Sequence, residues 1–244
     1  MTYSKNIRTN NKSFGIIILF IILQFLFPYS VKSHEIKNDD IEKIIKNYIV
    51  KNPEIIRSSL DNYATDLEKQ NFKSSINLLK KIDNPGIFQI NANITIYEFF
   101  DYNCGYCKSV FKTVQDTLAE DKNINFIFVE YPILSQLSYT TALAALASKN
   151  QGLYLEFHSS LMNLRSRINE NQIFDTAKKI GLDIEKLKTD MNNPKITNQL
   201  LQNREIAKSL GLNGTPAFII GDIIIPGAID KDKLKKLIKN FRES

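Results

Sequence analysis

The clearest pattern along the chain is a short apolar run that gives way to a helical one. Residues 94–100 (ITIYEFF) are mostly apolar, β-branched and aromatic, which is typical of a buried strand. Residues 108–119 then place apolar side chains at helical spacing. These are Val110, Phe111, Val114 and Leu118. The pattern predicts a strand that leads directly into an amphipathic helix.

The rest of the C-terminal half repeats this alternation. Residues 124–130 predict a second strand, and the order strand, helix, strand favours a parallel pair with a right-handed crossover. Residues 135–210 show no strand-like run, so we expect a helical subdomain inserted into an α/β frame. Its helices are expected at residues 139–149, 154–164, 172–180, 183–191 and 194–210. Residues 217–220 and 223–225 predict a hairpin, and residues 231–241 a terminal helix.

The N-terminal half has a helical pattern over residues 35–82, interrupted at Asn52-Pro53. Because proline suits the first turn of a helix, we expect two helices. The second carries an alternating four-three apolar seam for about two heptads, at Ile56, Leu60, Tyr63 and Leu67. Either this seam joins copies of the chain, or the helices fold back on their own domain. A turn cluster at residues 83–86 marks the boundary, and residues 87–90 predict a first strand beyond it.

The first 33 residues have the pattern of an export signal. Lys5, Arg8 and Lys12 precede an apolar run at residues 14–27, and residues 31–33 offer small side chains to a signal peptidase. The run is short for a transmembrane helix, which needs about 20 apolar residues, although an uncleaved anchor stays open. We therefore expect cleavage after residue 33 and a mature protein in the periplasm, an oxidising compartment.

The formal net charge of +6 owes much to this segment. It carries four lysine or arginine residues and no acid, so its removal leaves a charge of about +2. Lysines elsewhere alternate with acids and form no basic stripe. We therefore expect no nucleic-acid partner.

The chain has two cysteines, Cys104 and Cys107, and both lie between the predicted strand and helix. At a helix N-terminus, unpaired backbone N–H groups and the helix dipole stabilise a thiolate. Such a site lowers a cysteine pKa by roughly one to five units from ~8.5. We expect Cys104 to be the exposed attacking sulfur and Cys107, one turn later, to resolve the mixed disulfide. The spacing predicts a redox-active disulfide as the only cofactor.

Three other interpretations of the cysteine pair compete with this one. A zinc site wants four ligands, and the two histidines, His34 and His158, lie far away in the sequence, so we expect no metal. A structural disulfide would close a loop too small to restrict the unfolded chain much. The third reading is two unrelated core thiols. We interpret His158 as a packing residue rather than a catalytic base, and His34 as having no role.

Taken together, these residues resemble the DsbA-like branch of the thioredoxin superfamily. The resemblance rests on residues 99–107 (FFDYNCGYC), on residues 214–218 (GTPAF) before the hairpin, and on Glu98 six residues before Cys104. It covers about residues 87–242. It implies an α/β, thioredoxin-like domain over residues 85–244, with an inserted helical subdomain at about 135–210 and an N-terminal helical extension over residues 34–84.

The resemblance also implies roles for three residues besides the cysteines. The Thr215–Pro216 bond is expected to be cis and to face the disulfide, where the adjacent backbone binds substrate and Thr215 tunes the thiolate. Glu98 is expected beneath Cys107. A carboxyl on this apolar strand would have a raised pKa and could take the proton of Cys107 during resolution. The alternative is that Glu98 points to solvent or pairs with a lysine.

The direction of exchange is less determined. Gly105-Tyr106 is the dipeptide of DsbC-type isomerases, and residues 48–54 resemble the arm of oligomeric ScsC-type members. These features favour an isomerase or reductase that forms a homo-oligomer through residues 34–84, whereas the overall fold favours an oxidase, which we slightly prefer. Expected partners are unfolded or misoxidised secreted proteins and a membrane redox partner. The alternative of another class is a surface or structural protein with a static disulfide.

Overall fold

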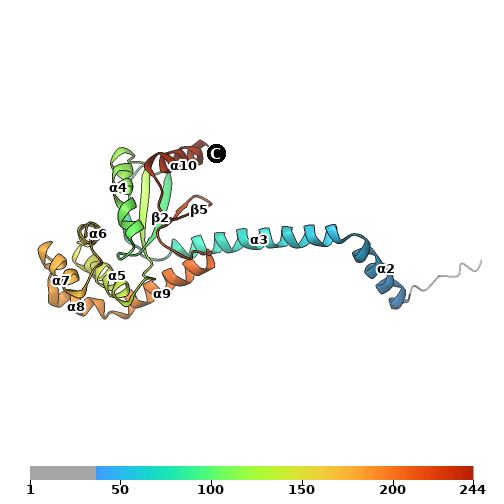
Figure 1. Ribbon diagram of the computed structural model, residues 1–244, viewed down its shortest axis with the longest axis horizontal. Coiled ribbons are helices and arrows are strands. Elements are labelled where there is room, and N and C mark those ends of the chain that lie inside the picture. The colour runs from blue at the N-terminus through green and yellow to red at the C-terminus, as the bar shows by residue number, and fades with distance from the viewer. Residues whose placement is uncertain (1–36, 244) are drawn as a thin grey trace, which may run out of the picture. The chain divides into compact units, whose positions relative to one another are not determined.

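The computed structural model describes residues 37–243 (Figure 1). The predicted signal peptide, residues 1–33, lies outside the described residues. The chain divides into two units, residues 1–60 and 61–244. The predicted arm of residues 34–84 is thereby divided between them.

The N-terminal unit, of which residues 37–60 are described, consists of helix α2 (Asn38–Lys51) and the start of α3 (Pro53–Leu79). The predicted break at Asn52-Pro53 is confirmed: the backbone N–H of Asn52 donates to the carbonyl oxygens of Tyr48 and Ile49, and Pro53 opens α3. Acids in its first turn and Lys51 in its last complement the dipole of α2. No residue of α2 is buried.

The C-terminal unit is built on a five-stranded sheet in the order β1-β3-β2-β4-β5. The strands are β1 (Gly86–Ile87), β2 (Ile94–Phe100), β3 (Ile124–Glu130), β4 (Ala217–Ile220) and β5 (Ile223–Pro226). The predicted parallel pairing of β2 with β3 is confirmed, and the other neighbours are antiparallel. The prediction of a strand at residues 87–90 is wrong in its extent. Pairing ends at Ile87, because the backbone N–H of Gln89 instead donates to the side chain of Asn125.

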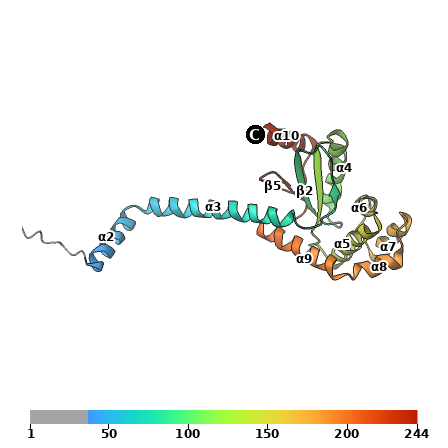
Figure 2. The ribbon, with the colours of Figure 1, turned by 180° about the vertical axis from the view of Figure 1, so that it is seen from behind.

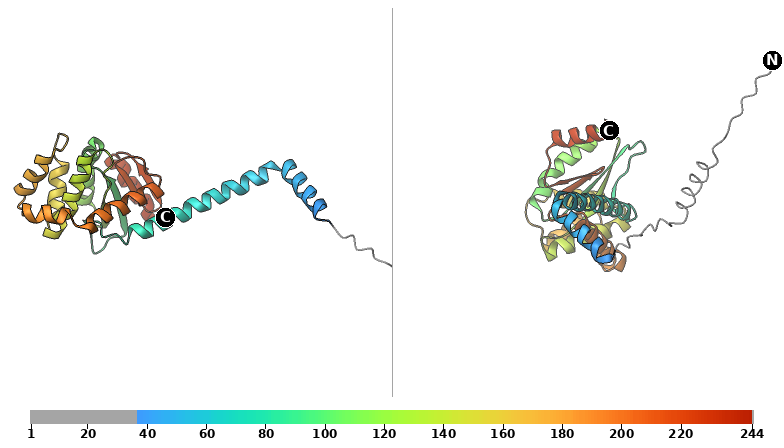
Figure 3. Two further views of the ribbon diagram at one scale, coloured as in Figure 1. Left: turned by 90° about the horizontal axis from the view of Figure 1, so that it is seen from below. Right: turned by 90° about the vertical axis from the view of Figure 1, so that its right-hand side faces the viewer.

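Two apolar cores cover the two faces of this sheet. On one face, Ile96 and Phe100 of β2 pack with α4 (Gly105–Glu120) and with α10 (Lys231–Glu243). Helices α4 and α10 lie side by side there (Figure 3). On the other face, Tyr97 and Phe99 pack with the end of α3 and with α9 (Pro194–Ser209). Burial on both faces explains why β2 is almost continuously apolar.

The inserted helical subdomain between β3 and β4 is confirmed (Figure 2). Its helices are α5 (Gln136–Ser148), the short 3₁₀ turn η1 (Lys149–Gln151), α6 (Tyr154–Met162), α7 (Glu170–Lys179), α8 (Ile184–Met191) and α9. Helix α5 begins three residues earlier than predicted, because the hydroxyl of Ser135 caps it by accepting from the backbone N–H of Ser138. Over residues 37–243, no helix is both long and apolar enough to span a bilayer.

Candidate active site

The two cysteines lie where β2 hands the chain to α4. Cys104 has the extended backbone of an N-cap residue, and Cys107 lies in the first turn of α4. The connecting loop is held by Asp101. One carboxylate oxygen accepts from the backbone N–H of Asn103 at 2.8 Å, and the other from those of Ile133 and Leu134 at 2.9 and 3.0 Å. The loop is thereby fixed to the segment that follows β3.

The helical subdomain supports the same loop from its other side. The side-chain oxygen of Asn103 accepts from the backbone N–H of Ile168 at 2.8 Å. Lys108, next to Cys107, donates to the carbonyl oxygens of Leu164 and Ser166 at 2.7 and 2.9 Å. These contacts join the start of α4 to the segment after α6, so the cysteines are positioned by the sheet and by the insertion together.

Both cysteines are free thiols and both are buried. The prediction that Cys104 is an exposed sulfur is therefore wrong: 6% of the residue is exposed, against 0% for Cys107. The reason is the segment before β4, since the Cys104 thiol donates to the carbonyl oxygen of Thr215 at 3.2 Å. The Thr215–Pro216 peptide bond is cis, as predicted. The structure thus brings Thr215 and Pro216 to Cys104 from 111 residues away in sequence.

The surroundings separate the acidities of the two thiols. Hydrogen bonding from the Cys107 thiol, then from Thr215 and the backbone of Cys107 and Tyr106, lowers the pKa of Cys104 to about 5, against the opposing effect of burial. The hydroxyl oxygen of Thr215 has no other hydrogen-bond partner among the described residues, so it is available to the thiolate. Burial, and next the Cys104 sulfur, raise the pKa of Cys107. At neutral pH the pair therefore holds a thiolate at Cys104 and a thiol at Cys107.

Glu98 lies on β2 and is completely buried. The alternative that it points to solvent or pairs with a lysine is wrong, because neither of its carboxyl oxygens has a hydrogen-bond partner among the described residues. Burial first, and then the charge of Cys104, raises the pKa of Glu98 to about 8. The carboxyl in turn contributes to the raised pKa of Cys107. Glu98 is thus an acid that is mostly protonated at pH 7 and within electrostatic reach of both sulfurs.

A buried polar cluster behind the cysteine loop was missed by sequence reasoning. The hydroxyls of Tyr102 and Tyr154 donate to one carboxyl oxygen of Glu130 at 2.9 and 2.8 Å. The Tyr102 oxygen also lies 3.0 Å from Nδ1 of His158, whose ring is buried among aromatic side chains. The one signal in the sequence was Glu130, an acid at the end of an apolar strand.

Burial opposes charge on the members of this cluster. Burial raises the pKa of Glu130 well above its usual range and lowers the pKa of His158 to about 3. Because Tyr102 stands two residues before Cys104, the cluster anchors the cysteine loop from within the core. No group of three or more potential metal ligands occurs among residues 37–243.

Comparison with known proteins agrees with this geometry. A family model described as thioredoxin matches residues 87–240. A thioredoxin-like oxidoreductase from Silicibacter pomeroyi is 35% identical, with a TM-score of 0.66 over 68% of this chain and 96% of that one. The thiol–disulfide exchange protein α-DsbA2 from Wolbachia pipientis is 27% identical, with a TM-score of 0.66 over 72% and 96%. The catalytic domain of Proteus mirabilis ScsC is 26% identical, with a TM-score of 0.65 over 72% and 98%.

The curated relatives that match first are larger proteins. A Na⁺/H⁺ antiporter NhaA from Salinispora tropica is 22% identical over 131 residues, which are 53% of this chain and 20% of the antiporter. The chain thus spans about a fifth of the length of that relative. The cysteine pair, the cis proline that faces it, the buried acid and the match over residues 87–240 together show that the chain belongs to the thioredoxin family, among its DsbA- and ScsC-type thiol–disulfide oxidoreductases.

Proposed function

We propose that the protein is an exported thiol–disulfide oxidase that passes its Cys104–Cys107 disulfide to secreted proteins. The observation that carries this proposal is the lowering of the pKa of Cys104 to about 5. Stabilising the Cys104 thiolate stabilises the reduced protein, which makes the disulfide form a better oxidant. A static disulfide would have no use for this stabilisation, so the reading as a structural or surface protein is disfavoured.

The exchange proceeds in two steps. A substrate thiolate attacks Sγ of Cys104 in the disulfide form, a mixed disulfide forms, and Cys107 leaves. The second substrate thiolate then attacks the substrate sulfur of the mixed disulfide, and Cys104 leaves as a thiolate. Two electrons pass from the substrate to the cysteine pair. The low pKa of Cys104 makes it the better leaving group in the second step.

Glu98 supplies the proton that the first step requires. The sulfur of Cys107 has a raised pKa and therefore leaves as a thiol rather than as a thiolate. Glu98 is buried beside it and, with a pKa of about 8, carries a proton at pH 7. In the reverse direction the same carboxylate takes the proton of Cys107 as that sulfur attacks a mixed disulfide.

The substrate is proposed to bind along the Thr215–Pro216 segment. Thr215 contacts Cys104 directly, and Pro216 leads into β4, so an extended peptide laid beside it would bring its cysteine to Sγ. The Tyr106 side chain, two residues after Cys104, is 72% exposed and offers an apolar surface to the same peptide. Unfolded or misoxidised secreted proteins fit this requirement, because their cysteines are reachable in extended segments.

The test of the proposal is the oxidation of a reduced, unfolded model protein in a glutathione buffer. We expect faster formation of its native disulfides with the wild-type protein than with Cys104→Ser. Equal rates for the two proteins would overturn the proposal. Fractionation of cells and N-terminal sequencing of the mature protein test export, for which we expect a chain that begins at His34. Reoxidation by a membrane redox partner would appear as loss of the disulfide form in cells that lack it.

A second candidate function is disulfide isomerisation by an oligomer, and one observation favours it. The apolar side chains of α2 are exposed: Ile41, Ile44, Ile45, Tyr48 and Ile49. Those of the seam on α3 are exposed as well: Ile56, Leu60, Tyr63 and Leu67. A second copy of this chain would cover such faces, because each copy presents the same apolar helices to the other.

An oligomer with several cysteine sites could hold a misoxidised substrate at one site while another exchanges its disulfides. The test compares the reactivation of a scrambled model protein with the oxidation of a reduced one, beside a measurement of mass in solution. A monomeric full chain that reactivates no scrambled protein would leave the oxidase alone.

A further inference from the structure

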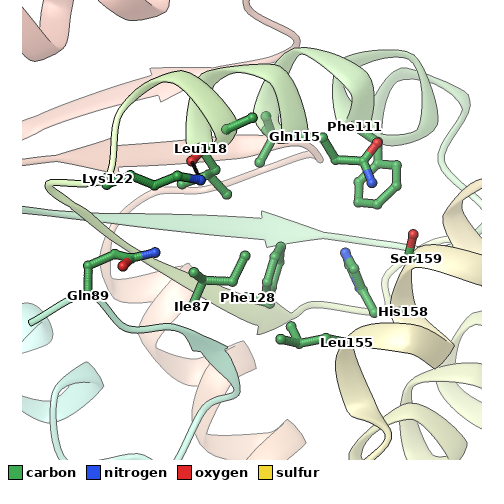
Figure 4. Close-up of a pocket in the computed structure, with 12 residues that line it drawn as sticks. Ile87, Gln89, Phe111, Gln115, Leu118, Lys122, Phe128, Leu155, His158 and Ser159 are labelled. Carbon is green, nitrogen blue, oxygen red and sulfur yellow. Dashed lines mark hydrogen bonds between the residues drawn. The ribbon is translucent and has the colours of Figure 1, made fainter.

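A pocket of about 350 Å³ lies beside α4 and has His158 of the buried polar cluster among its lining residues. It is formed by β1, α4, β3 and α6, and none of the cysteines, Glu98, Thr215 or Pro216 lines it (Figure 4). Its walls are largely apolar, with side chains from all four elements: Ile87, Phe111, Val114, Leu118, Phe128 and Leu155. Its volume is at the lower end of the range of small-molecule sites, roughly 300–1,000 Å³.

One end of the pocket contains a buried hydrogen-bonding atom without a partner. The His158 ring lines this end, and its nitrogen-bearing edge points toward α4 and Phe111 (Figure 4). The histidine is 1% exposed, and no described residue bonds to its Nε2. A buried polar atom left unpaired destabilises the free protein, and a ligand that pairs with it would remove this cost.

Which partner Nε2 requires depends on the tautomer of the His158 ring. The Tyr102 oxygen lies 3.0 Å from Nδ1, a contact that either tautomer can make. A neutral imidazole carries its proton on one ring nitrogen and presents a lone pair at the other. A hydroxyl both donates and accepts, so it can pair with Nε2 in either tautomer.

The opposite end of the pocket carries a positive charge. Lys122 and Gln89 lie there, separated from His158 by the apolar walls (Figure 4). Lys122 donates to the carbonyl oxygen of Leu118 at 2.9 Å and makes no ion pair with any residue of the described chain. No acidic residue is among the described residues that line the pocket. This end therefore favours an anion.

We propose that this pocket binds a small amphiphilic hydroxy acid, apolar in its middle, with its hydroxyl on Nε2 of His158 and its carboxylate at Lys122. The two polar ends and the apolar walls between them match such a molecule in order. The site would be separate from the thiol–disulfide exchange site, although Phe111 and Val114 belong to the same helix as Cys107.

The probe for the test is 3-(4-hydroxyphenyl)propionate, titrated into the full-length protein labelled with ¹⁵N-histidine. The chain has two histidines, so the imidazole signals of His158 can be assigned by comparison with His158→Gln. We expect a saturable shift of the Nε2 signal of His158, at probe concentrations in the range of about 1 mM or below. The absence of a saturable shift would overturn the proposal.

Two further probes resolve the two ends. We expect 3-phenylpropionate, which lacks the hydroxyl, to bind about two- to tenfold more weakly. Tyramine, which replaces the carboxylate by an ammonium, should be weaker by up to about fivefold. Equal affinities for all three probes would mean non-specific apolar binding and would refute the assignment of the ends.

Three variants complete the test. Leu155→Trp, at a position that is 40% exposed, should fill the pocket and abolish the shift while the wild-type rate of disulfide exchange is kept. Lys122→Gln should remove the preference for the carboxylate probe over tyramine. Lys112→Gln, on the exposed side of α4, is the matched control and should leave both the binding of the probe and the preference for the carboxylate unchanged. Undiminished binding by Leu155→Trp would place the probe elsewhere and sink the proposal.

Discussion

The cysteine loop and helix α2 of the N-terminal unit differ in how much of each is buried and hydrogen-bonded. In the loop, Asp101 and Asn103 accept from backbone N–H groups of two other segments, and Cys104 contacts Thr215. In the N-terminal unit, helix α2 has no buried residue, and its apolar side chains face outward. The comparison shows that contacts within the C-terminal unit hold the cysteine loop in place, whereas the apolar side chains of α2 are exposed.

Replacement of Cys104 by Ser tests the cysteine loop of this comparison and has the largest expected effect. The serine hydroxyl does not form a thiolate, so we expect exchange at the uncatalysed background. Mass in solution should be unchanged, since Cys104 is far from the N-terminal helices in sequence. The measurement is turnover of a fluorescent disulfide substrate, with Cys107→Ser as the control that traps the mixed disulfide instead. Substantial activity in Cys104→Ser would show that a different group starts the exchange.

Replacement of Glu98 by Gln tests whether the proton transfer also belongs to the single chain. General acid–base catalysis contributes about 10²–10⁴-fold, so we expect the reduction of the Cys104–Cys107 disulfide by a dithiol to slow by roughly 10²-fold. The carboxyl of Glu98 is raised to a pKa of about 8 and donates only while protonated, so the wild-type rate per substrate thiolate should fall as pH rises through 8. In Glu98→Gln that fall should disappear.

The control for this experiment is Glu205→Gln, at an exposed acid on α9 that pairs with Lys208. It should keep the rate and the pH dependence of the wild type. An unchanged rate in Glu98→Gln would remove the proton-transfer role and leave Glu98 as a residue that only tunes the potential.

The sequence sufficed for this part of the molecule where spacing carries the signal. The strand-to-helix junction and the break at Pro53 are local patterns, and the structure has both of them. The burial of Glu98 was expected through the resemblance to a family. The contact of Thr215 with Cys104 spans 111 residues and was expected only through resemblance to a family. No local pattern contains such a contact, because tertiary packing decides it.

The wrong predictions have the same cause, because tertiary packing decides the features that they concern. Cys104 was expected to be the exposed attacking sulfur, but the segment before β4 covers it. The buried cluster joins Glu130 at the end of β3 to Tyr154 and His158 of α6, two elements that are not adjacent in sequence. Its members look like separate polar residues until the sheet and α6 are packed together. The strand predicted at residues 87–90 is shorter in the structure, because the side chain of Asn125 replaces a backbone partner.

Replacement of Ile44 by Lys tests the other part of the comparison, the exposed apolar face of α2. If a second copy covers α2, a charge in that apolar face should lower the mass of the protein in solution to that of the monomer. Isomerisation of a scrambled protein should then fall by about tenfold or more, because simultaneous engagement of two sites is lost. Single-turnover exchange with a small disulfide should stay the same. Val50→Lys, about a third of a turn around α2 from Ile44 and outside this apolar face, adds the same charge at a residue that is 69% exposed and is the matched control.

An Ile44→Lys protein that keeps the mass of the wild type would show that α2 is covered by something other than a second copy. A monomeric wild type would have the same consequence for the isomerase reading. Either result would leave the oxidase reading intact, because the cysteine loop depends on residues of the C-terminal unit alone.

Replacement of Thr215 by Val makes the smallest change, the loss of one hydroxyl beside Cys104. A hydrogen bond to a charged group contributes about 1.5–3 kcal/mol, and one pKa unit corresponds to about 1.36 kcal/mol, so the pKa of Cys104 should rise by one to two units. The sign follows from the thiolate being the form that the hydroxyl stabilises. Its measurement is the pH dependence of thiolate ultraviolet absorbance, with Thr140→Val on exposed α5 surface as the control. An unchanged Cys104 pKa would mean that Cys107 and the backbone of α4 stabilise the thiolate without Thr215. Thr215 would then have no part in tuning the acidity of Cys104.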